Sequence, residues 1–243
     1  MRGWWAQTRA EVSMTVRRGE TLLLTVGIPV TLLVFFTEVR VTATPPGPRV
    51  SFFAPGIIGL CVMSTSLVAL SISTAFERSY GVLKRLHVTP LSRTRLITAK
   101  IVAVVLVQIF QVSVVVGVAV ALGWRPSGGV SGAAQTVVVL LLATASFAGV
   151  GLALAGRLRA ELNLAAANGL YLVLLLLSGF IIPVTTFPRI LRNLVAGTPS
   201  GAMANGLHRV LTVGGTVGTS PLICLVVWAV LAPLLAARTF RFD

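Results

Sequence analysis

The stretch FERSYGVLKRLHVTPLSRTRLITAK, residues 76–100, separates two long apolar runs and contains both lysines of the chain. On a helical wheel drawn from Phe76, apolar residues gather on one face and charged residues on the opposite face. This pattern predicts an amphipathic helix of about three turns, which we place over residues 76–88. The helix is expected to end before Pro90, because the residue before a proline is pushed out of the α region.

A basic segment of this kind has two interpretations. It can be a plain loop that follows the positive-inside rule, in which Lys and Arg stay in the cytoplasm. It can also be a short helix that lies along the membrane surface and offers one face to a soluble partner. The amphipathic pattern and the abrupt stop at Thr89-Pro90 favour the second interpretation.

The composition of the chain is that of an integral membrane protein. Of its 243 residues, 56% are hydrophobic and only 11% are charged, whereas soluble domains are about 25% charged. The net charge of +14 comes from 20 basic residues that punctuate apolar runs, so it indicates loops beside anionic lipid and not a nucleic-acid surface. Cys61 and Cys224 both lie inside apolar runs, and neither a disulfide nor a metal site is expected from them.

Six apolar segments read as membrane spans, the first of them shorter than the roughly 20 residues that a span needs. They cover residues 21–37, 53–75, 96–122, 133–155, 164–182 and 222–237. The predicted fold is therefore one all-α integral membrane domain over residues 1–243.

Two other segments carry helical patterns but are too polar to span. Residues 2–19 place Trp5 and Val12 on one face, which predicts a helix in the membrane interface; the alternative is a frayed tail. Residues 183–220 can begin helices near Pro188 and Ser200. They form either an ordered outside loop or two half-helices that dip into the outer leaflet, where irregular backbone is tolerated only when it is buried in protein or lines a cavity.

Charge counting orients the predicted spans. The chain ends and the loops after the second and fourth spans carry 14 of the 20 Lys and Arg residues, and the opposite side carries the other six. The positive-inside rule therefore places both termini and residues 76–100 in the cytoplasm.

Reactive groups are expected to be scarce inside the membrane. None of the six acidic residues falls within a predicted span, and we expect no Lys or Arg in the interior either, whereas proton- or sodium-coupled carriers usually keep such a group there. No nucleophile–base pair or metal-ligand cluster is evident. Neither lysine follows a glycine, as a phosphate-binding P-loop requires. The chain is therefore not expected to be an enzyme or to hold a cofactor itself.

One string supports a resemblance to a known family. Glu77-Arg78-x-x-Gly81-x-Leu83-Lys84-Arg85-Leu86, followed by Thr89-Pro90-Leu91-Ser92-Arg93, resembles the first cytoplasmic loop of type-2 ABC exporter permeases of the daunorubicin and multidrug-resistance type. In that family the loop carries a coupling helix, which sits in a groove of a separate ATP-hydrolysing subunit. The family also begins with an elbow helix and closes its outer gate with re-entrant helices, which residues 2–19 and 183–220 are expected to form. One departure is Ser79-Tyr80, where the family often has a second acid.

The resemblance implies a function. A permease of this family works as a homodimer or paralogous heterodimer with two ATPase subunits, which bind ATP and Mg²⁺, and exports hydrophobic or amphiphilic compounds such as drugs and antibiotics. Only two of the 20 basic residues are Lys, which suggests a GC-rich bacterial gene and hence a bacterial cell membrane. Two alternatives stay open: a related permease for a cell-envelope lipid or lipid-linked glycan, and an ATP-independent channel or scaffold.

The resemblance also assigns roles to residues. Those expected to contact the ATPase are Glu77, Arg78, Lys84 and Arg85, with Gly81 permitting close approach and Tyr80 and Leu83 anchoring the helix. Spans two and five line the dimer interface in this family, so the candidates for the substrate pathway are Ser66, Ser73, Asn168 and Tyr171. Against that reading, Ser commonly bonds back to its own helix, and Asn and Gln commonly join helices. The pairs Gly56/Gly59 and Gly149/Gly151 are expected to mark close helix packing.

Overall fold

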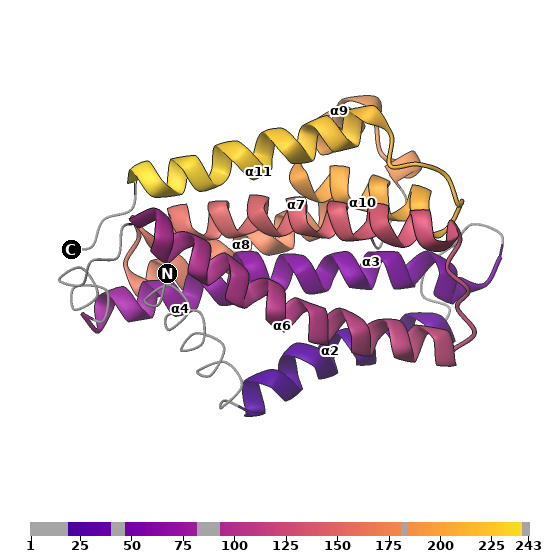
Figure 1. Ribbon diagram of the computed structural model, residues 1–243, viewed down its shortest axis with the longest axis horizontal. Coiled ribbons are helices and arrows are strands. Elements are labelled where there is room, and N and C mark those ends of the chain that lie inside the picture. The colour runs from indigo at the N-terminus through magenta and orange to yellow at the C-terminus, as the bar shows by residue number, and fades with distance from the viewer. Residues whose placement is uncertain (1–18, 40–46, 82–92, 181–183, 240–243) are drawn as a thin grey trace.

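The computed structural model of the chain describes residues 19–39, 47–81, 93–180 and 184–239, and within them it contains helices and no strand (Figure 1). The predicted all-α class is thereby confirmed. The helices are α2 (Gly19–Glu38), α3 (Arg49–Met63), η1 (Ser64–Ala69), α4 (Leu70–Ser79), α6 (Arg93–Ala121), α7 (Gly129–Ala155), α8 (Ala160–Leu177), η2 (Val184–Thr186), α9 (Arg189–Ala196), α10 (Pro199–Leu211) and α11 (Thr219–Thr239).

Five helices are long and apolar enough to cross a membrane. They are Arg49–Ser79, Thr98–Ala121, Gly129–Ala155, Ala160–Leu177 and Thr219–Arg238. The first predicted span falls on α2, whose apolar part, Thr25–Glu38, is shorter than a span. Five of the predicted spans therefore correspond to helices that are long and apolar enough to cross a membrane, and the sixth, over residues 21–37, stays a prediction. The interfacial helix predicted over residues 2–19 lies almost wholly outside the described residues.

The long antiparallel helices have two ends (Figure 1). We call the end where α4 and α7 finish and where α6 and α8 begin the α4 end. The opposite end, where α3 begins and where α9 and the α6–α7 loop lie, is the α9 end.

The central helix of the bundle is the continuous run of α3, η1 and α4. It spans 31 residues, and 83% of its most apolar window is buried inside the protein, against 17% for α8 and for α11. Helices α2, α6, α7, α8 and α10 all contact it. The outward faces of α6, α8 and α11 are therefore the surfaces available to lipid or to another chain.

The middle of this central helix is a π-helix, η1. The Leu70 N–H donates to the carbonyl of Thr65, five residues earlier, instead of four. Such π segments are rare, and they often occur at functional positions in helices. Gly151 of α7 packs directly on η1, because a Cβ built there would lie 2.8 Å from the Leu67 carbonyl oxygen.

Glycines allow close helix contacts at other places as well. A Cβ at Gly149 would lie 2.4 Å from the backbone nitrogen of Pro233, where α7 meets α11. Cβ atoms at Gly56 and Gly59 would meet Phe180, which follows α8. The prediction that these glycine pairs mark close packing is confirmed.

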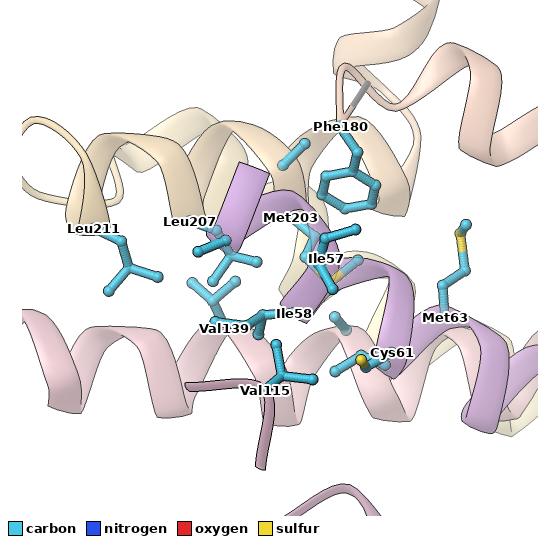
Figure 2. Packing of buried hydrophobic residues seen from close by; sticks show 14 of the residues in the cluster. Ile57, Ile58, Cys61, Met63, Val115, Val139, Phe180, Met203, Leu207 and Leu211 are labelled. Carbon is cyan, nitrogen blue, oxygen red and sulfur yellow. The ribbon is translucent and has the colours of Figure 1, made fainter. Parts of the chain in front are cut away.

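Helix α10 completes the core. Most of its residues are buried, and it packs on α3 and α7 (Figure 2). Figure 2 shows Met203, Leu207 and Leu211 of α10 beside Ile57 and Ile58 of α3 and Val139 of α7. The segment before α11 thus holds η2, α9 and α10, the last two near the starts predicted at Pro188 and Ser200, and α10 is part of the bundle.

The hairpin of α9 and α10 has identifiable start signals. Pro188 immediately precedes α9, and Pro199 occupies the first turn of α10, where a missing N–H costs nothing. The Thr198 side chain accepts from the Gly201 N–H at 3.1 Å, which caps α10. Gly201 lies against α9, since a Cβ there would be 2.2 Å from the Val195 carbonyl oxygen.

Candidate functional site

The chain leaves the central helix by a glycine turn. Helix α4 continues to Ser79, and Gly81 then takes the left-handed conformation, with φ of +71°, while its N–H donates to the Arg78 carbonyl at 3.0 Å. This is a glycine C-cap, which stops the helix. The expectation of one helix running from Phe76 through Gly81 was therefore wrong, because residues 76–79 are the last turn of α4. Residues 82–88 lie outside the described residues, so a coupling helix there stays a prediction.

Glu77 points into the bundle at the α4 end. The Lys100 Nζ donates to Glu77 Oε2 at 2.7 Å, which joins α4 to α6. The side chain of Lys100 is 1% exposed and that of Glu77 is 19% exposed. The expectation that no basic residue lies inside a span was wrong for Lys100, which falls within Thr98–Ala121. Glu77 of the neighbouring helix pairs with its buried ammonium group, and a reading of single segments cannot see such a partner.

Arg78 also has an intramolecular partner. Its Nη2 donates to the carbonyl of Leu158, in the turn between α7 and α8. Two turns earlier, the Ser71 hydroxyl donates to Asn163 Oδ1 at 3.0 Å, which joins the central helix to α8. The last turns of the central helix are thus bonded to α6, to the α7–α8 turn and to α8. Contact of Glu77 and Arg78 with an ATPase stays a prediction.

The other predicted coupling residues divide into two groups. Tyr80 is 73% exposed and stacks on Phe76, with ring centroids 6.0 Å apart. Phe76 in turn packs on a small buried cluster of Ala75, Ala155 and Ala160. Tyr80 therefore contacts the bundle through Phe76. Leu83, Lys84 and Arg85 lie outside the described residues.

The four candidates for a substrate pathway do not converge on a cavity. The hydroxyls of Ser66 and Ser73 donate to the carbonyls of Val62 and Leu70, and Asn168 donates to the Leu164 carbonyl. These are bonds within one helix, the ordinary role of such residues. Ser66 is buried, Ser73 and Asn168 are exposed, and Tyr171 packs against the core. A role in transport stays a prediction for all four.

A buried polar network in the middle of the bundle was only partly visible in the sequence. Gln108 Nε2 donates to Thr65 Oγ1 at 2.9 Å and to the Val62 carbonyl at 3.2 Å. Thr144 Oγ1 donates to Gln108 Oε1 at 2.7 Å. The network ties α6 and α7 to the π segment. Gln residues were expected to join helices in general, but nothing in the sequence indicated Thr144 or the π segment.

A second candidate site lies at the α9 end. A cavity of about 550 Å³ opens among α9, α10 and the starts of α3 and α11. Its polar lining residues are Thr185, Arg192, Asn205, His208, Arg209 and Ser220, and its apolar ones include Phe52, Val195, Ala202 and Pro221. Sequence reasoning identified the two helices but not the cavity, which depends on how they are packed.

His208 is one of the residues that line this cavity. Its ring stacks on that of Phe52, with centroids 5.0 Å apart, and its Nε2 is buried without a hydrogen-bond partner. His208 lies outside the membrane-spanning helices, and burial lowers the pKa of its imidazole to about 4. The ring is therefore neutral at physiological pH.

These features define a class of protein. The bundle of apolar helices is that of a multi-pass membrane protein. The described residues hold no group of three His, Cys, Asp or Glu that could bind a metal ion. Their polar groups instead join helices, at the α4 end and in the middle of the bundle, as expected where rigid elements must keep fixed positions in lipid.

A comparison with family models then places the chain. The model described as ABC-2 type transporter matches residues 2–211, so the chain belongs to the ABC-2 type transporter family. It is a permease component of an ABC transporter and not catalytic by itself, and membership implies an ABC ATPase partner. The predicted type-2 ABC permease is confirmed, while its daunorubicin-type subgroup stays a prediction. No curated protein matches the chain.

Proposed function

We propose that the chain is the membrane subunit of an ATP-driven exporter that moves hydrophobic or amphiphilic compounds, including drugs, out of the cytoplasm or inner leaflet of a bacterial cell membrane. Two permease chains and two ATPase subunits form the working transporter, and the ATPase subunits hold ATP and Mg²⁺. Both termini and the α4 end face the cytoplasm, in agreement with the distribution of Lys and Arg in the sequence.

The observation that carries this proposal is the bonding of the α4 end. Glu77 is paired with Lys100 of α6, and Arg78 is bonded to the Leu158 carbonyl between α7 and α8. A displacement of the turn at Tyr80–Gly81 is therefore transmitted to α6, α7 and α8 together. Motion of an ATPase pressed on the following residues would move these helices as a rigid body, which is a recognised way of switching between states.

This bonding gives the predicted coupling residues different roles. Glu77 and Arg78 hold the turn to the bundle in addition to their predicted contact with the ATPase, Lys84 and Arg85 supply the other predicted contacts, and Leu83 anchors the helix. At the α9 end, α9 and α10 form the outer gate and lie in the outer leaflet. Burial of ten α10 residues supports that assignment, because backbone at such depth must be covered by protein.

The first experiment is co-purification of the tagged chain from its native membranes in mild detergent. We expect an ABC-type ATPase to co-purify. Its absence, under conditions that preserve known complexes, would overturn the proposal. Substrate-stimulated ATP hydrolysis in proteoliposomes, with drugs in one series and lipid-linked glycans or envelope lipids in another, then separates the drug exporter from a lipid or glycan exporter.

The transmission role is tested with two arginine variants. Arg78→Ala removes the bond to Leu158, whereas Arg157→Ala removes an exposed arginine from the neighbouring turn. We expect Arg78→Ala to retain the ATPase on purification but to lower transport per ATP hydrolysed about tenfold, the worth of one charge-assisted hydrogen bond. Arg157→Ala should leave both quantities unchanged. Equal behaviour of the two variants would refute transmission through Arg78.

A further inference from the structure

The cavity at the α9 end combines apolar walls with positive charge. Its volume of about 550 Å³ is within the range of small-molecule sites. Val195, Ala202 and Pro221 supply apolar surface, while Arg192 and Arg209 supply two guanidinium groups. No acidic residue is among the described residues that line it. The cavity is therefore suited to a ligand that is partly apolar and partly anionic.

The positive charge at this end lacks acceptors within the described part of the protein. Neither Arg192 nor Arg209 has a carboxylate partner there. Arg209 lies against the loop before α11, since a Cβ at Gly218 would be 2.3 Å from its Nη1. Arg49, at the start of α3, lies over the Phe53 ring at 5.8 Å and has both terminal nitrogens buried without a hydrogen-bond partner. Glu38 ends α2 at the same end of the bundle but does not line the cavity.

His208 adds a hydrogen-bonding group to the lining of the cavity. Its Nε2 has no partner among the described residues, and leaving a buried polar atom unpaired is costly. When this nitrogen carries the proton, it can donate to an anionic oxygen in the cavity. Arg192, Arg209 and His208 come from α9 and α10, whose relative position is fixed by the contact of Gly201 with Val195.

We propose that this cavity binds an anionic phospholipid. The phosphate lies between Arg192 and Arg209, because guanidinium groups match phosphate oxygens in geometry as well as in charge. His208 donates to the same phosphate, and the lipid chains follow the apolar wall out of the cavity. The proposal does not depend on the drug-export function, since the site stands on the cavity and its charges alone.

Native mass spectrometry of the intact chain in non-ionic detergent tests this site. The protein is titrated with phosphatidylglycerol and, in parallel, with zwitterionic phosphatidylcholine. We expect phosphatidylglycerol to bind about tenfold more tightly, and Arg192→Ala/Arg209→Ala to abolish most of that difference. The matched control is Arg125→Ala/Arg189→Ala, which removes two exposed arginines of the same end that do not line the cavity.

Two further measurements keep the proposal falsifiable. His208→Phe retains the stacking on Phe52 but removes Nε2, and should weaken phosphatidylglycerol binding about threefold to tenfold with an unchanged thermal midpoint. Inorganic phosphate at about 10 mM, enough to occupy a site with a Kd of about 1 mM, should displace little lipid. Equal losses in the two double variants, or full displacement by free phosphate, would overturn the lipid site.

Discussion

The two ends of the bundle are held together by different interactions. At the α4 end, side chains form an ion pair and hydrogen bonds across helices, through Glu77, Arg78 and Ser71. At the α9 end, glycines let backbones touch, as Gly201 does with Val195 and Gly56 with Phe180. Polar bonds can be exchanged for others when a partner moves, whereas close-packed backbones resist change. The comparison suggests that the α4 end receives motion and that the α9 end follows as one piece.

The largest effect is expected from breaking the ion pair at the α4 end. Lys100→Met leaves the Glu77 carboxylate, only 19% exposed, without this ammonium group, and should lower the free energy of unfolding by about 3 kcal/mol. Unfolding in mixed detergent micelles measures this quantity.

The control for Lys100→Met is the double change with Glu77→Gln. It should recover most of the lost stability, because no net charge is then left at the buried site. A double variant as unstable as the single one would show that Lys100 matters for its packing and not for its charge.

A slightly smaller effect is expected at the α9 end, where the mechanism is steric. Gly201→Leu forces a side chain against the Val195 carbonyl oxygen, 2.2 Å from the ideal Cβ, and should cost about 2 kcal/mol. Gly197→Ala is the control, because its Cβ would meet only the Leu194 carbonyl oxygen, at 3.5 Å. If thermal midpoints fall equally for both variants, close contact between α9 and α10 is not what stabilises this end.

The turn after α4 allows backbone strain at Gly81 to be distinguished from the close approach of a partner. Gly81 has φ of +71°, so Gly81→Val should cost about 1–2 kcal/mol, while Gly81→Asn, which tolerates this conformation, should cost less. Space is not limiting, since nothing lies within 4 Å of a Cβ at Gly81. Measured together with ATP hydrolysis in the assembled transporter, Gly81→Val should reduce coupling more than Gly81→Asn. The reverse order would indicate that glycine is needed for close approach of a partner.

The smallest effect concerns pH and His208. The folded pKa of about 4 lies below the ordinary value of 6.5, so the unfolded chain binds the extra proton first as pH falls. The stability contributed by the neutral ring is complete above pH 6.5 and is lost as pH falls toward 4. Between pH 7.5 and 5.5 the loss should be about 1 kcal/mol. His208→Phe should remove this slope, and a slope that survives the change must come from other groups.

Much of the fold was predictable because a membrane helix is encoded by a local run of apolar residues. Apolar length predicted five of the long helices, and helix starts near Pro188 and Ser200 were predicted where α9 and α10 begin. Glycine pairs predicted close packing. These properties depend on a residue and its near neighbours in the chain, which a single sequence contains.

The remainder depended on partners distant in sequence. Lys100 was unexpected inside a helix because its partner Glu77 lies 23 residues away. The helical wheel from Phe76 failed at Gly81 because a wheel assumes that the helix continues, and a left-handed residue ends it. The cavity at the α9 end is formed by five helical elements, so no one segment could indicate it.

The π segment Ser64–Ala69 sets the angular phase of everything that follows it in the central helix. A turn closed by i→i+5 bonds holds one residue more than an α turn, so it shifts later side chains by about 100° around the axis, the angle of one residue in a helix of 3.6 per turn. Deleting a single residue there would relax the turn to α geometry and leave Glu77 and Arg78 facing Lys100 and Leu158, because the turn would lose only the residue that it holds in excess. The same deletion among the regular α-helical residues 70–76 would instead rotate both side chains by about 100° away from their partners.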